Sequence, residues 1–348
     1  MIRHSIAFRA VVLAAVLTLT VIGGSRAEPP VEIHLAHGQS QISPDDPAAI
    51  MAAEFKRRVE EGSGGAVLVH IFPESRLGGN REMAKLVERN VIQTALITAG
   101  GLAPQYPLIA VTQFPFLIDN RAAGRSIYDG GFGQRLAADI QAKTPYVVLG
   151  FGEPAGLQII TNSQRPVTHP QDMAGLKIRG IPGFASLDTM IRGLGATPIK
   201  VSSREEYNAL SSGVVDGQMV PANIVLPRHF DQVQKYATLT YHLYSPYIWI
   251  FNKSAFDALP PETADLVRAA ATAAITHGYE TTRAWDDSEG GLRALRQRLK
   301  VQDLSAAQRA EFAAVTQPAV KAEIRASLGA DGEEWLNRLF AAAQAQKR

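Results

Sequence analysis

One arginine lies where a charged side chain needs a partner. Arg179 stands in the segment LKIRG, which is typical of a short buried strand, and small and apolar residues follow it. A guanidinium presents five donors in a planar fork that matches a carboxylate. Because buried arginines are normally paired, the partner is either a protein carboxylate, with Asp172, Asp216 or Glu153 as candidates, or a ligand carboxylate. Residue types alone leave both alternatives open.

Other chemical motifs are weak. Residues 150–155 (GFGEPA) match G-x-G-x-x-A, but Pro154 lies inside the loop and a strand follows, so an interdomain turn is favoured over a dinucleotide site. His34 and His37 are three apart on a predicted strand and point to opposite faces, so no metal site is predicted. No HExxH, GxSxG or Walker A motif occurs. We therefore predict no catalytic residue, no cofactor and no enzyme.

Length and composition indicate a globular protein of two domains. The chain has 348 residues, 46% of them hydrophobic and 20% charged, enough for two cores. It contains no cysteine, which excludes disulfides, thiolate metal ligands and a cysteine nucleophile.

The first 27 residues have the three parts of a secretory signal peptide. Arg3 and Arg9 precede an apolar run too short to span a membrane comfortably, and Ser25 and Ala27 provide small residues for cleavage. The alternative is an uncleaved anchor, which would leave the domains on the same side of the membrane. Of the 35 basic residues, three lie in this acid-free segment, so 32 basic residues face 33 acidic ones in the rest. No basic block suggests nucleic acid.

Strand and helix patterns alternate along the chain, which favours open α/β sheets. Asn80 is expected to cap one helix, and Ser202 or Ser203 another, with Glu205 or Glu206 completing a capping box. Strands are predicted at 31–37, 66–72, 92–99, 146–152, 156–162, 176–180, 197–201 and 214–220. Helices are predicted at 48–61, 81–90, 184–195, 203–213 and 223–233, the last bent or broken near Pro227.

A long extended segment, residues 236–256, is suited to crossing between domains. A long helical region (264–299) and terminal helices follow it. No flexible linker is apparent, so the domains are expected to be joined by ordered, hinge-like segments. After the signal peptide (1–27), we predict domain I at 28–156 plus 247–285 and domain II at 157–246 plus 286–348, both α/β.

Several segments together resemble one known family. ITNSQRPVTHPQDMAGLKIRGIP, GATPIKVSSREEYNALSSGVVDGQ and YSPYIWIFNKSAFDALP, in this order, are similar to the periplasmic solute-binding proteins of TRAP transporters, the DctP-like family. The resemblance covers nearly all of the chain after the signal peptide. It implies a two-domain periplasmic-binding-protein-like fold, with a ligand cleft between the domains, crossing strands and a long hinge-spanning helix. It also implies that Arg179 binds a ligand carboxylate.

The sequence departs from the commonest pattern of that family at three places. Gln158 stands where many members have a second arginine, Val220 replaces a frequent ligand asparagine, and Asn223 is the nearby candidate. Ser202 and Ser203 replace a pocket aromatic residue. These differences predict a single cationic clamp, which favours a monocarboxylate such as a 2-oxo, hydroxy or aromatic acid.

Other binding residues follow from position. Phe184 could form a wall of the pocket or only pack its own helix. Tyr247 and Trp249 share one strand face, and we expect Tyr247 at the pocket and Trp249 in the core. His37 and Gln39 lie at the end of the first strand, where open α/β sheets bind ligands.

The resemblance implies a periplasmic binding protein that closes on a small carboxylate and delivers it to TRAP membrane permease subunits. One alternative is an extracytoplasmic ligand sensor built on the same module. Another is a secreted enzyme acting on a carboxylic acid, with Glu153 or His37 as the base. The sequence does not identify the acid, an accompanying cation or the oligomeric state.

Overall fold

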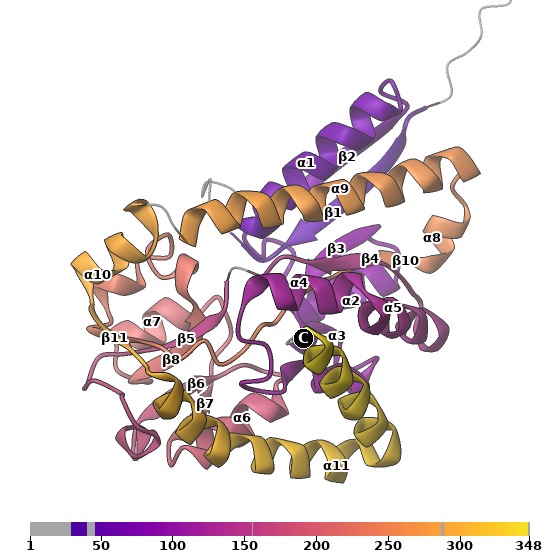
Figure 1. Ribbon diagram of the computed structural model, residues 1–348. Coiled ribbons are helices and arrows are strands. Elements are labelled where there is room, and N and C mark those ends of the chain that lie inside the picture. Colours follow the sequence, from indigo (N-terminus) through magenta and orange to yellow (C-terminus); the bar gives the residue numbers. More distant parts are fainter. Residues whose placement is uncertain (1–28, 40–45, 155, 287–288, 347–348) are drawn as a thin grey trace, which may run out of the picture.

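The computed structural model describes residues 29–39, 46–154, 156–286 and 289–346 (Figure 1). The predicted signal peptide lies outside these ranges. Within them, no helix is both long enough and apolar enough to span a membrane.

The first sheet has five strands in the order β2-β1-β3-β10-β4. β1 pairs in parallel with β2 and β3, and β10 runs antiparallel between β3 and β4. Its strands are β1 (Val31–His37), β2 (Val67–Phe72), β3 (Thr94–Ile97), β4 (Tyr146–Gly152) and β10 (Tyr247–Asn252).

The second sheet has six strands in the order β11-β9-β5-β8-β6-β7. They are β5 (Gln158–Asn162), β6 (Lys177–Gly180), β7 (Thr197–Lys200), β8 (Gly217–Pro221), β9 (Tyr236–Leu239) and β11 (Lys300–Asp303). The chain changes sheet between β4 and β5 and returns between β9 and β10, as the long extended segment predicts. The mixed α/β class is confirmed; the exact domain boundaries stay a prediction.

Helices cover both faces of the first sheet. α1 (Pro47–Gly62) and the long α9 (Pro261–Asp286) pack on each other over one face, where Phe55 lies 5.1 Å from Trp249 between ring centroids. Trp249 is fully buried, as predicted. The other helices beside this sheet are α2 (Asn80–Glu88), α3 (Ala99–Leu102), η1 (Pro107–Gln113), α4 (Arg121–Asp129), α5 (Gly131–Lys143) and α8 (Lys253–Asp257).

Shorter helices connect the strands of the second sheet. These helices are η2 (Pro170–Met173), α6 (Ala185–Gly193), α7 (Glu206–Ser211), η3 (Ala222–Ile224), η4 (Phe230–Gln232), η5 (Glu289–Arg293) and α10 (Ala294–Arg298). Along the chain, α6 follows β6 and α7 follows β7.

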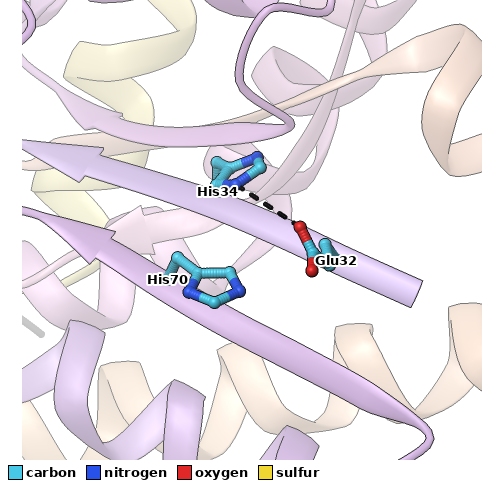
Figure 2. Close-up of side chains that lie close together, drawn as sticks. All are labelled: Glu32, His34 and His70. Carbon is cyan, nitrogen blue, oxygen red and sulfur yellow. Dashed lines mark ion pairs between the residues drawn. The ribbon is translucent and has the colours of Figure 1, made fainter. Parts of the chain in front are cut away.

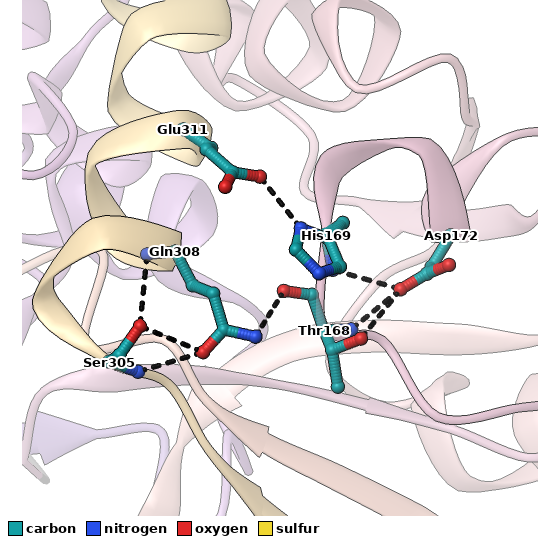
Figure 3. A network of polar contacts seen from close by, with 6 residues as sticks. All are labelled: Thr168, His169, Asp172, Ser305, Gln308 and Glu311. Carbon is teal, nitrogen blue, oxygen red and sulfur yellow. Dashed lines mark hydrogen bonds and ion pairs between the residues drawn. The ribbon is translucent and has the colours of Figure 1, made fainter.

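The last helix, α11 (Ala306–Ala345), runs along both sheet units (Figure 1). It breaks at Gly329, whose φ of 60° suits glycine. Before the break, α11 packs on α6 and is joined to the η2 region, because Gln308 donates to the Thr168 carbonyl and His169 contacts Glu311 (Figure 3). After it, Trp335 packs edge-on against Phe132 of α5. The helix therefore ties the two sheet units together.

Two predicted helix caps are wrong. α2 begins at Asn80, but the Asn80 side chain accepts a hydrogen bond from the Thr98 N–H instead of capping the helix. The N-cap of α7 is Glu205, with no side-chain cap. Ser202 instead donates to Glu205, and Glu206 is committed to arginines, as described below. A long-range hydrogen bond thus replaces the cap of α2, whereas at α7 Ser202 bonds to a neighbouring side chain and Glu206 to distant arginines.

The helix predicted at 223–233 is not formed, although the predicted interruption near Pro227 is observed. This segment forms the two 3₁₀ turns η3 and η4, separated by a left-handed residue, His229, with φ of 57°. Pro227 interrupts the segment, since proline removes a backbone donor within a helix.

Candidate functional site

A cavity of about 350 Å³ lies between the two sheet units and is the main candidate site. The first unit contributes the end of β1, the start of α2, the β3–α3 junction and the start of β10. The second contributes β5, the β6–α6 loop, the β7–α7 region and β8. Its polar lining residues are Gln39, Asn80, Arg81, Glu82, Thr98, Gln158, Arg179, Ser202, Ser203, Glu206, Arg228, Ser245 and Tyr247.

A second cavity of about 320 Å³ adjoins the first. Gln39, Ser203, Ile224 and Arg228 line both cavities and therefore lie at the boundary between them. Asn223 also lines the second cavity.

Arg179 lies on β6 and is only 7% exposed. Its Nε donates to the Val201 carbonyl at 3.2 Å, and its Nη1 donates to Glu206 Oε1 at 2.5 Å. The question that the sequence left open thus has a specific answer. Arg179 has a protein carboxylate as partner and also lines the cavity.

The partner is none of the three acids considered from the sequence. Asp172 accepts from the backbone N–H groups of the Thr168–His169 turn. Asp216 accepts from the Lys177 backbone N–H at 2.7 Å. Glu153 lies 3.5 Å from Arg121 and accepts from a tyrosine hydroxyl.

Glu206 is shared between two arginines. It is 1% exposed, and its Oε2 accepts from Arg228 Nη1 at 2.7 Å. Arg228 also donates to the Ser203 carbonyl and lies over the Phe230 ring. Two guanidinium groups thus share one carboxylate at the cavity wall. The formal charge of this group is +1, which suits an additional anion.

Burial is electrostatically costly for Arg179. Desolvation lowers the pKa of its guanidinium, the Glu206 carboxylate raises it, and Arg228 lowers it again, so the net direction is downward. A ligand carboxylate would add a counter-charge to a positive group that is not fully compensated.

The prediction of a single cationic clamp is wrong. Arg228 and Arg81 line the cavity beside Arg179. Arg228 was missed because its segment was expected to be helical, and Glu206 because it was assigned to a cap. No local signal distinguishes either residue, because Glu206 lies 27 positions from Arg179 and 22 positions from Arg228 along the chain.

Two side-chain amides face the cavities with atoms left unbonded. Gln158 on β5 is 8% exposed, lines the first cavity, and its Oε1 has no hydrogen-bond partner among the described residues. Asn223 is 2% exposed and lines the second cavity. Both atoms of its amide group lack a partner within the described ranges. Buried amides are normally bonded, so the Gln158 oxygen suits a ligand hydroxyl, and the Asn223 amide can both donate to a ligand and accept from it.

Of the remaining predicted residues, Tyr247 and Gln39 line the first cavity, whereas His37 does not. Tyr247 lines the first cavity, and its hydroxyl accepts from Gln39 Nε2 at 2.7 Å. Burial raises the pKa of Tyr247, so it stays neutral. His37, in contrast, lines neither described cavity. His37 is buried, and its Nδ1 accepts a hydrogen bond from the Gln39 backbone N–H. Burial lowers the pKa of His37 to about 4.

Phe184 joins the two units across the cleft. It lines the first cavity at the start of α6, and its ring lies against Gly100 of α3. A Cβ at Gly100 would lie 2.2 Å from the ring, so only glycine permits this approach.

The comparisons with known proteins agree with this geometry. The family model DctP, described as bacterial extracellular solute-binding protein, family 7, matches residues 37–326. The chain belongs to this family. It is a solute-binding protein of the TRAP type, as the sequence resemblance implied.

Two relatives and one solved structure illustrate the degree of similarity to known proteins. A C4-dicarboxylate-binding periplasmic protein of Rhodobacter capsulatus is 30% identical over 330 residues, covering 92% of this chain and 94% of that protein. A solute-binding protein of Verminephrobacter eiseniae is 33% identical over 206 residues, 59% of this chain and 61% of the relative. The TRAP periplasmic solute-binding protein of Polaromonas sp. JS666, bound to D-erythronate, has a TM-score of 0.80 and 28% identity, covering 89% of this chain and 98% of that one.

The similarity confirms the two-domain periplasmic-binding-protein fold.

Proposed function

We propose that this protein captures a small organic acid in the cleft and delivers it to the membrane permease of a TRAP transporter. The observation that carries the proposal is the group of Arg179, Glu206 and Arg228, in which two guanidinium groups share one carboxylate at a cavity wall. A permanently unbalanced cation in a cleft is a docking point for an anion.

Arg179 has donors left for a ligand. Its hydrogen bonds to described residues use Nε and Nη1, and none uses Nη2. A ligand carboxylate can approach Nη2 from the cavity while Glu206 and Val201 hold the guanidinium in place. The protein carboxylate therefore orients the arginine instead of replacing the ligand.

The ligand class that fits best is a monocarboxylate carrying hydroxyl or oxo groups. The formal charge of +1 balances one carboxylate. The unbonded Gln158 oxygen can accept from a ligand hydroxyl, and the Asn223 amide can also donate to an oxo group. The D-erythronate held by the Polaromonas protein is an acid of this kind. The second carboxylate of a dicarboxylate would have only Arg81 to bind, because Arg228 is already engaged with Glu206 and the Ser203 carbonyl.

Closure of the cleft converts binding into a transport signal. Residues from both sheet units line the cavity, so a bound acid bridges them and favours the closed arrangement. The permease would then recognise the closed form in the periplasm, after removal of residues 1–27. The secreted-enzyme alternative is less well supported, because its candidate bases, Glu153 and His37, line neither described cavity.

The test is a thermal-shift screen of residues 28–348 against monocarboxylates and dicarboxylates, including erythronate, galactonate, pyruvate, benzoate and succinate. A ligand at 100 times its dissociation constant adds about 2.7 kcal/mol to apparent stability. We expect the largest shift with a hydroxy or oxo monocarboxylate and none with Arg179→Ala. Absence of any shift, or shifts that persist in the variant, would contradict the proposal.

A cellular experiment separates transport from sensing. Deleting the gene should abolish uptake of the identified acid, and restoring the wild-type gene should recover it. Normal uptake with a lost transcriptional response would support the sensor alternative instead.

A further inference from the structure

Three metal-ligating side chains gather on the first sheet, away from the residues that line the cleft cavities. Glu32 and His34 lie on β1 and His70 lies on the neighbouring β2, with the Glu32 carboxylate beside the two rings (Figure 2). One ligand atom from each residue lies within 4.8 Å of the others. His34 Nε2 is 3.9 Å from Glu32 Oε2, and the two ring centroids are 5.3 Å apart.

Sheet geometry holds the three side chains together. His34 and His70 are direct register partners in the parallel β1–β2 pair, so their side chains share a face. Glu32 precedes His34 by two positions and lies on the same face. The alternate residues Ile33 and Val69 are buried under α1 and α9. The histidine pair therefore points away from that core.

His34 is oriented by a hydrogen bond on the far side of its ring. Its Nδ1 lies 3.1 Å from Gln93 Oε1, which also accepts from the His34 backbone N–H at 2.9 Å. An amide oxygen can only accept, so Nδ1 carries a proton, and in the neutral tautomer the lone pair is on Nε2. Nε2 is the atom that faces Glu32. Histidines that bind metals are commonly oriented by such a second hydrogen bond.

We propose that Glu32, His34 and His70 form a binding site for a divalent transition metal, best fitted to Zn²⁺. Two imidazoles and one carboxylate are ligands that zinc accepts, with water completing a tetrahedron. Glu32 and His70 are exposed and His34 is partly exposed, so the ion has access, and the side chains can close on it by small rotations. The ion would fasten β2, an outer strand of the sheet, to β1.

The test uses untagged protein freed of metal and titrated with ZnCl₂ against a chromophoric chelator. We compare the wild type with Glu32→Gln, His70→Gln and the double variant His34→Gln/His70→Gln. His277→Gln is the matched control, since it removes an exposed histidine from α9. Circular dichroism verifies that each variant is folded.

We expect one Zn²⁺ per wild-type chain, affinity at least tenfold lower in each single variant, loss in the double variant and no change in the control. Co²⁺ should give tetrahedral visible absorption in the wild type that disappears in the double variant. Absence of a wild-type site, or equal binding by the double variant, would overturn the proposal and leave Glu32 and His34 as a surface ion pair. The acid-induced thermal shift should persist in His70→Gln, which separates this site from the cleft.

Discussion

Arg179 Nη1 and Glu206 Oε1 are 2.5 Å apart in a buried ion pair that forms part of the cavity wall. The same carboxylate also binds Arg228. Arg179 is thus both a structural residue, held in place from one side, and a binding residue open to the cavity on the other. Preorganisation of this kind lowers the cost of fixing the guanidinium when a ligand binds.

Removal of the Arg179 fork should weaken binding of the acid strongly. We expect Arg179→Ala to cost about 2–5 kcal/mol of binding free energy, and Arg179→Lys to recover only part, since an ammonium keeps the charge but lacks the planar fork. Isothermal titration calorimetry with the best acid from the screen measures both. Lys177→Ala is the control, because Lys177 is on the same strand but is exposed to solvent. Equal affinities in all the variants would refute the role of Arg179.

Neutralising Glu206 should lower the stability of the ligand-free protein and increase the thermal shift that the acid produces. Glu206→Gln leaves two guanidinium groups without a counter-charge, so the ligand-free protein should lose about 3–5 kcal/mol of unfolding free energy. A bound acid replaces part of the missing charge, so its thermal shift should be larger than in the wild type. Glu205→Gln, at the exposed neighbouring position, should change neither quantity strongly. A smaller ligand shift in Glu206→Gln would argue against the shared-carboxylate model.

The contact between Gly100 and Phe184 should be needed for closure. In Gly100→Ala, the new methyl group would meet the Phe184 ring at 2.2 Å, so the units must separate or the ring must move. We expect acid affinity to fall at least tenfold, with a smaller change in melting temperature. Gly131→Ala is the control, because a Cβ there has no atom within 4 Å. Small-angle X-ray scattering with saturating acid should show a more open variant; a compaction equal to the wild type's would contradict this interpretation.

The contact between His169 and Glu311 should make stability depend on pH (Figure 3). The hydrogen bond to Glu311 raises the pKa of His169 above its ordinary value of 6.5. Because the pKa of His169 is higher in the folded than in the unfolded protein, protonation of His169 stabilises the fold. This stabilisation is fully present below pH 6.5 and is lost as the pH rises through the pKa of the folded state. The melting-temperature difference between wild type and His169→Gln should therefore shrink from pH 6 toward pH 8.5. A difference that is constant across this range would exclude the coupling.

All strands of the two sheets except β11 could be predicted from the sequence, because the signal for a strand is local. The strand Tyr146–Gly152 is observed with the predicted bounds, and the segment through Tyr247 crosses between the sheets as expected. The spacing and the number of apolar residues within a segment determine such strands, and contacts with distant residues contribute little. The helices α4 and α5 drew no prediction, and the glycines at 130, 131 and 133 dilute their periodic pattern.

The site could be predicted only in part, because its key contacts are distant in sequence. Arg179, Gln158, Phe184, Tyr247 and Gln39 line one cavity, as the family resemblance and their positions on or beside strands suggested. Their role in binding stays a prediction. The shared carboxylate could not be foreseen, since local rules assign Glu206 to a helix cap and Arg228 to a helix.

The most direct test of the central claim is a crystal structure of the protein with the acid that gives the largest thermal shift. We predict that the ligand carboxylate lies in the cavity between the sheet units, about 2.7–2.9 Å from the Arg179 guanidinium, with Glu206 still bound to its other side. A carboxylate bound elsewhere, with Arg179 contacting only Glu206 and Val201, would show that the arginine is a structural ion pair and would contradict the proposed mechanism.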